Sequence, residues 1–203
     1  MIGRALAKQT DHLVCLHMTE AHERKKQPEI VRRALLDCAA QISQEQGLPA
    51  VTLQAVADAA HVTKGGLLHH FPNKQALVQA VFHDLLEQLD AQIDELLEDD
   101  PDAHGRFTRA YIRAFANADS QGASNWNALP LSSLTDPEMK AMWSDWYASR
   151  LARHAETDAG PELGIARYAA DGLWLAGLLE YSGVEATGQD VLIEQLISMT
   201  RKT

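Results

Sequence analysis

Imidazole and thiol groups near the N-terminus are the residues of this chain that could hold a metal ion. Zinc takes such ligands, but the spacing of these four matches no standard zinc pattern. They are His12, Cys15, His17 and His22. In another interpretation, Met18 is the physiological start, and residues 1–17 are upstream sequence or a disordered arm. We therefore predict no metal site.

Motifs for catalysis are also missing from the sequence. It contains no Gly-rich phosphate loop, no G-x-S-x-G elbow, no H-E-x-x-H and no CxxC. Asp99 and Asp100 are adjacent carboxylates, but we place them in a surface turn, where hydration explains them. We expect neither an enzyme nor a cofactor. A small helical enzyme or ligand-binding bundle without DNA binding is the alternative function.

Two short helices separated by a tight break form the most informative segment. Thr52 can cap the first, and Thr63 can cap a second that ends at Phe71. With a third helix over 29–46 they make a helix-turn-helix, whose second helix fits the ~12 Å major groove of DNA. If Leu67 and Phe71 face the core, the residues of the second helix that face outward are Lys64, Gly65, Leu68 and His69.

Apolar residues recur at helical spacing through the rest of the chain, and no alternating strand pattern is present. Asn73 can cap a long helix that continues to about Leu97. Further helices are predicted over 103–117, from Pro137, from Pro161 and over 189–199, with a loop over 121–136. The apolar stripe of the helix from Pro161 consists of Ile165, Tyr168, Ala169, Gly172, Leu173 and Ala176. The predicted fold is all-α. Its expected parts are a flexible extension (1–27), a helix-turn-helix segment (28–74) and a larger helical segment (75–203).

Charge is distributed unevenly along the 203 residues, whose formal net charge is −10. Residues 1–75 contain nine Lys/Arg and seven Asp/Glu, whereas the remainder contains nine and 21. An acidic body would repel phosphate and leave the N-terminal part to approach it. The two cysteines form no disulfide framework, and we find neither a membrane-spanning run nor a secretory signal. We expect a soluble cytoplasmic protein with no membrane partner.

The segment VTLQAVADAAHVTKGGLLHHFPNKQALVQAVF, residues 51–82, resembles the DNA-binding signature of the TetR family of transcriptional regulators. The matched positions are Thr52, Ala57, Ala60, Val62, Thr63, Gly65 or Gly66, Leu67, His70, Phe71, Lys74 and Leu77. The resemblance implies a dimer with an N-terminal helix-turn-helix DNA-binding domain (28–74) and a larger helical effector-binding and dimerisation domain (75–203). Two positions differ, because Leu68 stands where the family usually has a phosphate-binding tyrosine, and His61 replaces the turn glycine.

The resemblance also implies roles for single residues. Thr52, His70 and Lys74 would bind phosphates, while Lys64 is the best candidate to read bases because an ammonium can donate to guanine O6 and N7. His70 could instead be a packed histidine beside Phe71, and Lys74 a solvated charge. The full predicted DNA-binding set is Thr52, Gln54, Thr63, Lys64, Gly65, Gly66, Leu68, His69, His70 and Lys74. Arg24, Lys25 and Lys26 form either a DNA-contacting arm or solvated surface.

Aromatic residues gather in the C-terminal part and predict a pocket for a hydrophobic or aromatic small-molecule effector. The alternative is that these rings are ordinary core. They are Phe107, Tyr111, Phe115, Trp126, Trp143, Trp146, Tyr147 and Trp174.

The segment 172–179 is apolar on almost every side, so both of its faces must be covered, most simply by a second copy of the chain. The segment RYAADGLWLAGLLEYSG, residues 167–183, is similar to the penultimate helix that builds many TetR-family dimers. The predicted dimer residues are Gly172, Leu175, Ala176 and Leu179.

These observations predict a homodimeric, effector-responsive repressor. Two recognition helices would enter successive major grooves of a near-palindromic operator, with half-sites about one helical turn (~10 bp) or somewhat more apart. A ligand that prefers a wider dimer would shift the population away from the DNA-binding state. The long helix that starts near Gln75 is the expected lever.

Overall fold

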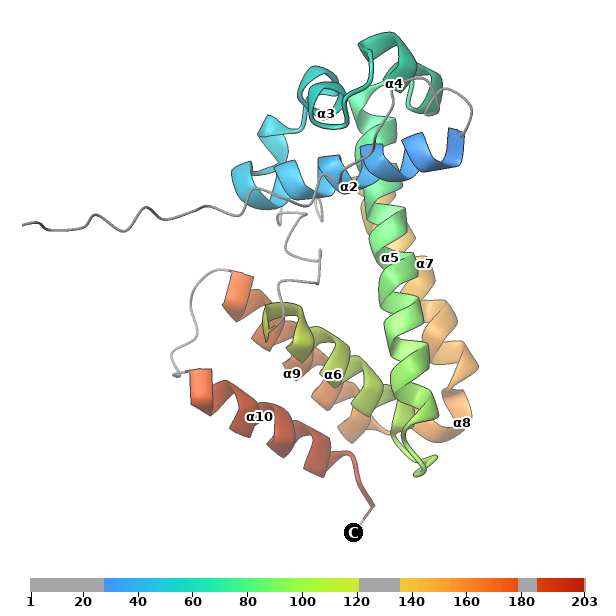
Figure 1. The fold of residues 1–203 in the computed structure, drawn as a ribbon. Coiled ribbons are helices and arrows are strands. Elements are labelled where there is room, and N and C mark those ends of the chain that lie inside the picture. Colours follow the sequence, from blue (N-terminus) through green and yellow to red (C-terminus); the bar gives the residue numbers. More distant parts are fainter. Residues whose placement is uncertain (1–27, 121–135, 179–185, 203) are drawn as a thin grey trace, which may run out of the picture.

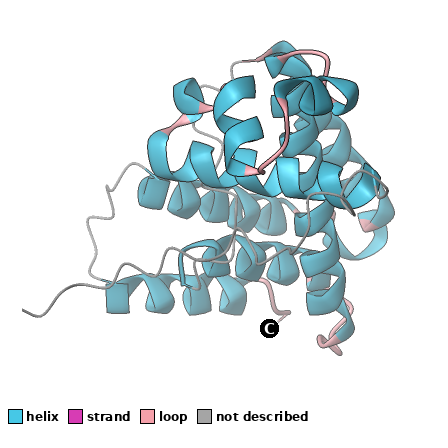
Figure 2. Cartoon of the chain, turned by 45° about the horizontal axis from the view of Figure 1, so that its top comes forward, coloured by secondary structure: helices cyan, strands magenta, loops and turns pink. Residues whose placement is uncertain are grey.

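The computed structural model describes residues 28–120, 136–178 and 186–202, and every regular element within them is a helix (Figure 2). The prediction of an all-α fold is confirmed. Several residues singled out above lie outside the described ranges, and nothing is concluded about their surroundings. They are His12, Cys15, His17, His22, Arg24, Lys25, Lys26, Trp126 and Leu179.

Three helices and a short 3-10 turn form the N-terminal head, seen at the top of Figure 1. They are α2 (Pro28–Gln46), η1 (Leu48–Ala50), α3 (Leu53–Ala59) and α4 (Lys64–His70). Gly47 follows α2 with a φ of 80°, a left-handed conformation that suits glycine after a helix. The predicted helix over 29–46 and the predicted helix starts after Thr52 and Thr63 are confirmed.

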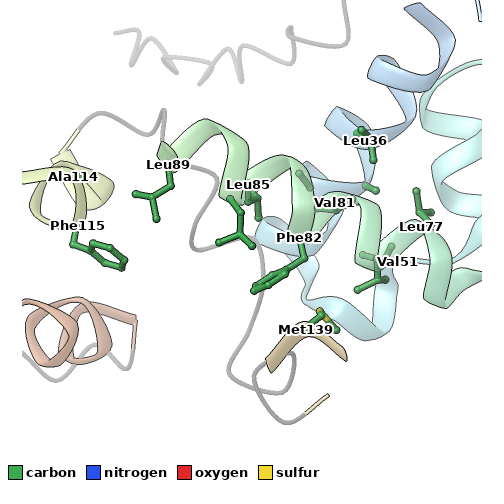
Figure 3. Close-up of a cluster of buried hydrophobic side chains, with 14 of the residues drawn as sticks. Leu36, Val51, Leu77, Val81, Phe82, Leu85, Leu89, Ala114, Phe115 and Met139 are labelled. Atoms are coloured by element: carbon green, nitrogen blue, oxygen red, sulfur yellow. The ribbon is translucent and has the colours of Figure 1, made fainter. Parts of the chain in front are cut away.

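Helix α5 (Lys74–Glu98) runs from the head along the length of the molecule and is the central element of the fold (Figure 1). The Asn73 side chain caps it by accepting a hydrogen bond from the Ala76 N–H at 2.8 Å. It packs on α2 of the head and on α6 and α7. Figure 3 shows the buried face of α5 that makes these contacts, with Leu77, Val81, Phe82, Leu85 and Leu89 along it.

The remaining helices form the body around the second half of α5. They are α6 (Arg106–Ser120), α7 (Pro137–Arg153), α8 (Ala155–Asp158), α9 (Pro161–Leu178) and α10 (Ala186–Met199). Helix α6 packs most extensively on α9 and α5, and α10 covers both α9 and α6. Helix α7 runs beside α5 (Figure 1). None of the helices described is long and apolar enough to cross a membrane.

Three expectations about the body are wrong. Asp100 does not lie hydrated in a surface turn, because it is buried and accepts a hydrogen bond from Arg109 Nε at 2.6 Å. This turn also delays the start of the next helix from the predicted residue 103 to Arg106, after Gly105 with a φ of 69°. The apolar stripe predicted for α9 is not its buried face, since Ile165 and Tyr168 are exposed.

Arginine side chains connect the helices of the body from within. Arg109 Nη2 also donates to the Asp102 carbonyl at 2.7 Å, which fixes the turn between α5 and α6. Arg150 on α7 donates to Asp94 on α5 at 2.6 Å. Arg167 on α9 donates to Thr108 on α6 at 2.5 Å and to the Tyr147 hydroxyl on α7 at 3.2 Å. All three arginines are buried, so these bonds form in a medium that screens charge weakly.

Candidate nucleic-acid interface

The break between α3 and α4 is fixed by backbone hydrogen bonds and one left-handed residue. The Ala60 N–H donates to the Val56 carbonyl at 2.9 Å, and the Val62 N–H donates to the Ala57 carbonyl at 2.9 Å. His61 adopts a φ of 54° between them. A side chain in this conformation costs about 1 kcal/mol, and the turn forms despite that cost. The angle between the two helices is thereby set locally.

Helix α4 has a buried and an exposed face, as its spacing predicts. Leu67 is fully buried and Phe71, at its C-terminal end, is nearly so. The guanidinium of Arg32 on α2 lies 4.7 Å from the centre of the Phe71 ring, which closes the head over this face. The exposed face carries Lys64, Gly65, Leu68 and His69, and the Leu68 side chain is 40% exposed. An apolar side chain this exposed at the tip of the head is available for contact.

Thr52 and Thr63 position the starts of the two helices. The Thr52 hydroxyl accepts a hydrogen bond from the Ala55 N–H at 3.1 Å, and the Thr63 hydroxyl accepts one from the Gly66 N–H at 3.1 Å. Each hydroxyl keeps its own hydrogen for donation outward. Both residues are exposed, so each can cap its helix and still donate to a phosphate oxygen.

Lys64, Gln54 and Lys74 differ in the hydrogen bonds and ion pairs that they already form within the protein. Lys64 is exposed, and no acidic side chain of the described residues forms an ion pair with it. The Gln54 amide nitrogen donates to Asp58 at 2.8 Å along α3, which leaves its carbonyl oxygen to accept. Lys74 is half-buried, and its Nζ donates to the Leu48 carbonyl at 3.1 Å. Lys64 is therefore the side chain best placed to reach a base.

His70 and Lys74, at the C-terminal end of α4 and the start of α5, both contact other residues of the head. The His70 side chain is half-buried beside Phe71, with 6.4 Å between the ring centres, so packing and phosphate contact both stay open. Lys74 ties the η1 turn to the start of α5 and is not simply a solvated charge, although its ammonium has further hydrogens to donate.

Comparison with known families covers both parts of the chain. Residues 35–81 match the model of the bacterial regulatory proteins of the tetR family, and residues 105–201 match the tetracyclin repressor-like C-terminal domain. The HTH-type transcriptional regulator BetI from Burkholderia cenocepacia is 32% identical over 166 residues, which are 74% of this chain and 84% of that protein. The chain belongs to the TetR family. It is thus a DNA-binding transcriptional regulator, in a family of regulators rather than enzymes.

Other similar proteins agree with this TetR-family assignment. BetI from Vibrio campbellii is 29% identical over 184 residues, covering 84% of this chain and 92% of that protein. The structure of the ketosteroid transcriptional regulator KstR2 of Mycobacterium tuberculosis has a TM-score of 0.58, with 19% identity over 84% of this chain and 95% of that chain. At this identity the structural match shows the shared fold alone.

The aromatic residues of this TetR-family body form one connected cluster. Tyr111 lies 4.5 Å from Phe115 and 5.9 Å from Tyr147 between ring centres. Phe115 lies 6.2 Å from Trp143 and 6.3 Å from Trp174. Seven of the eight predicted pocket residues belong to this cluster, and the eighth, Trp126, is not described. The seven are Phe107, Tyr111, Phe115, Trp143, Trp146, Tyr147 and Trp174.

The described cavities adjoin this cluster at two places. A closed space of about 10 Å³ touches Phe115 and Trp174, room for about one water molecule. A much larger groove of about 530 Å³ lies between α5 and α7 and includes Trp146. Most of the cluster is therefore packed ring against ring in the described residues, and ligand-sized space opens at its Trp146 end.

Sequence reasoning missed the polar groups within this aromatic cluster. The Tyr111 hydroxyl donates to Asp171 at 2.5 Å, and burial raises the pKa of that carboxyl. Burial also lowers the pKa of His154, whose ring stacks on Phe107 at 4.8 Å. The signal available in the sequence was a charged residue within an otherwise apolar helix, since Asp171 interrupts the apolar run of α9.

Exposed apolar side chains are concentrated on the last two helices. Ile165 is 60% and Tyr168 70% exposed on α9, while Val191 is 66% and Met199 50% exposed on α10. Gly172, predicted at the dimer interface, is also exposed, and Leu175 and Ala176 are half-buried. Helices α9 and α10 pack on each other, so these exposed residues lie on adjacent helices.

Proposed function

We propose that this chain is a homodimeric repressor that binds a near-palindromic operator with α4 of each subunit in the major groove. The observation that carries the proposal is the outward face of α4, where Lys64 stands without an acidic partner among the described residues. The rigid α3–α4 turn holds that face at a fixed angle. An outward cation on a rigidly held helix is what base reading requires.

The contacts follow from the chemistry of the exposed groups. Lys64 donates to a guanine edge, and Leu68 contacts a thymine methyl in place of a tyrosine hydroxyl on phosphate. Thr52, Thr63, His70 and Lys74 donate to phosphates, while Gln54 and His69 lie at the margins of the groove. Gly65 and Gly66 let the start of α4 approach the DNA closely.

Dimerisation would use the exposed apolar surface of α9 and α10. A large exposed apolar patch marks an interaction site, and a self-complementary patch gives a two-fold dimer. Gly172, Leu175 and Ala176 would allow close approach of the two α9 helices, and Leu179 extends the same segment. Two copies of α4 then face the same side of the DNA.

Effector response would act through α5, which packs on both the head and the body. We divide the chain into a DNA-binding domain (28–74) and an effector-binding and dimerisation domain (75–203). A small molecule bound among the body helices would favour the dimer with widely separated heads and so lower operator affinity. The aromatic cluster favours a hydrophobic or aromatic effector.

The test is fluorescence anisotropy of the full chain on DNA from directly upstream of its own coding region. Scrambled DNA and two salt concentrations separate specific from non-specific binding, and light scattering gives the mass. Lys64→Ala should weaken specific binding about 10- to 100-fold, since each subunit loses a base contact. Lys140→Ala, on the exposed surface of α7, is the matched control and should change affinity less than about two-fold.

Three outcomes decide the proposal. Tighter binding of a dimer to upstream than to scrambled DNA, lost in the Lys64 variant alone, supports it. An equal loss of DNA affinity in both lysine variants would mean that Lys64 acts by general charge attraction and does not read a base. A monomer without DNA binding at low salt would favour the alternative of a small helical ligand-binding bundle.

A further inference from the structure

The groove of about 530 Å³ between α5 and α7 has the size of a small-molecule site. One face of α5 contributes six residues, and α7 contributes two. The lining residues are His83, Leu86, Glu87, Asp90, Ala91, Asp94, Met142 and Trp146. The groove lies on the α5–α7 side of the body, whereas the apolar surface described above belongs to α9 and α10 (Figure 1).

Trp146 gives the groove a fixed aromatic wall. Its indole Nε1 donates to Asp90 on α5 at 2.7 Å, and its ring lies 5.1 Å from that of Trp143 behind it. Leu86, almost fully buried, forms an apolar floor beside it. A ring that is already held in place loses little conformational freedom when a ligand stacks on it.

The polar side of the groove is acidic. Glu87, Asp90 and Asp94 line it, and their side chains are partly or largely exposed. The arginine that contacts two of these carboxylates, Arg150, is buried beneath them and does not line the groove. His83 also lines the groove, and its Nδ1 lies 3.6 Å from Glu87 Oε2. Three carboxylates against the buried Arg150 and this histidine leave a net negative charge with His83 in either protonation state.

We infer that this groove binds an organic cation with an aromatic body. The aromatic body stacks on Trp146 above Leu86 and Met142, and the positive charge lies against Glu87 and the outer oxygens of Asp90 and Asp94. A cation gains from both surfaces at once, whereas an anion of the same shape is repelled. Such binding does not depend on the proposed operator recognition, because it takes place on the body of the free protein.

The probe pair is tetraphenylphosphonium and tetraphenylborate, two ions of nearly equal size and apolar surface with opposite charge. Isothermal titration calorimetry of the full chain should give saturable binding of the phosphonium and at least about tenfold weaker binding of the borate. Equal binding of both ions would overturn the inference, since hydrophobic contact would then be sufficient.

Charge-reversal variants place the site. Glu87→Lys should weaken phosphonium binding about tenfold or more, because Glu87 is largely exposed and its reversal leaves the packing of α5 intact. Glu95→Lys makes the same charge change at an exposed position of α5 outside the groove and should have less than about a two-fold effect. Equal effects of the two variants would overturn the inference. Operator binding is measured separately on the same preparations, so a failure here is distinguishable from a failure of the proposed function.

Discussion

Positive charge is used in opposite ways in the two parts of this molecule. In the helix-turn-helix, Lys64 faces outward without an acidic partner among the described residues. In the body, Arg109, Arg150 and Arg167 face inward and are almost fully buried. The head leaves Lys64 exposed, whereas the body uses these three arginines to hold its helices together. The acidic residues of the body are then left to dominate its surface.

This difference has a physical consequence for DNA binding. Residues 76–203 contain nine Lys/Arg against 21 Asp/Glu, and three of those arginines are unavailable to solvent. Acidic residues therefore outnumber the cations of the body, which repels phosphate and favours approach of DNA by the head. Four substitutions test this difference between the head and the body, and their expected effects decrease from the first to the last.

Arg109→Met should cause the largest loss of stability. It leaves the Asp100 carboxylate buried without its guanidinium, and breaking a buried pair from one side costs about 3–5 kcal/mol. Burial by itself opposes ionisation of Asp100, but the Arg109 bond and the Asp102 N–H outweigh it and lower the carboxyl pKa. Urea unfolding followed by circular dichroism measures the change in the free energy of unfolding.

The control for this prediction is Arg153→Met at the exposed end of α7, which should cost less than about 0.5 kcal/mol. A loss of under about 1 kcal/mol in Arg109→Met would mean that the buried arginines of the body add little to its cohesion.

Ile165→Asp should next disrupt the proposed dimer. A charge on the exposed apolar face of α9 has no partner when that face is buried by a second copy, so association should weaken about 100-fold, or about 2.7 kcal/mol. Light scattering over a dilution series gives the dissociation constant. Ile30→Asp makes the same change at an exposed isoleucine of the head and should leave the mass unchanged. A variant at position 165 that remains fully dimeric would move the interface elsewhere.

Gly65→Ala should separate stability from recognition. A Cβ at position 65 meets no atom within 4 Å, so the fold accepts it and gains up to about 1 kcal/mol in helix propensity. If the start of α4 rests against DNA, the same methyl group should reduce operator affinity about tenfold. Gly164→Ala on α9, where the nearest atom to a Cβ is 3.9 Å away, should leave operator affinity unchanged. Unchanged affinity in the Gly65 variant would place α4 farther from the bases.

The sequence was sufficient to predict the head because its structure is determined locally. Thr52, Thr63 and Asn73 each cap the helix that directly follows, and Leu67 and Phe71 share a face through i,i+4 spacing. Family resemblance was then needed to assign roles, since a helix-turn-helix pattern alone does not separate Lys64 from any exposed lysine.

The interior of the body was not predictable in the same way, because its polar partners are distant in sequence. Arg150 donates a hydrogen bond to Asp94, which lies 56 residues earlier in the chain, and Tyr111 donates one to Asp171, which lies 60 residues later. Nothing in the local pattern of either helix indicates such a pair. Helix α9 was misjudged for a related reason: its segment is apolar on almost every side, so helical spacing alone did not separate the buried residues from the exposed Ile165 and Tyr168.

Asp171→Asn tests the smallest effect, the cost of an acidic group inside the body. Burial raises the pKa of Asp171, while the Tyr111 hydroxyl and the charge of Arg167 partly offset this. A carboxyl whose pKa is higher in the folded than in the unfolded chain favours folding when protonated. Its contribution is therefore full below the unfolded pKa of about 3.9 and is lost as the pH rises through the folded pKa.

The asparagine variant should accordingly become more stable relative to the native protein as the pH rises from 4 to 7. The gain should stay below about 1 kcal/mol, because Tyr111 and Arg167 already offset part of the cost of burying the native carboxylate. Unfolding free energies at several pH values measure this gap, and Asp145→Asn, at an exposed site of α7, should show no such trend. A variant that is instead less stable at pH 7 would mean that Tyr111 and Arg167 more than compensate burial. The body would then gain stability from an inward acid just as it does from its inward arginines, and the contrast with the head would extend to both signs of charge.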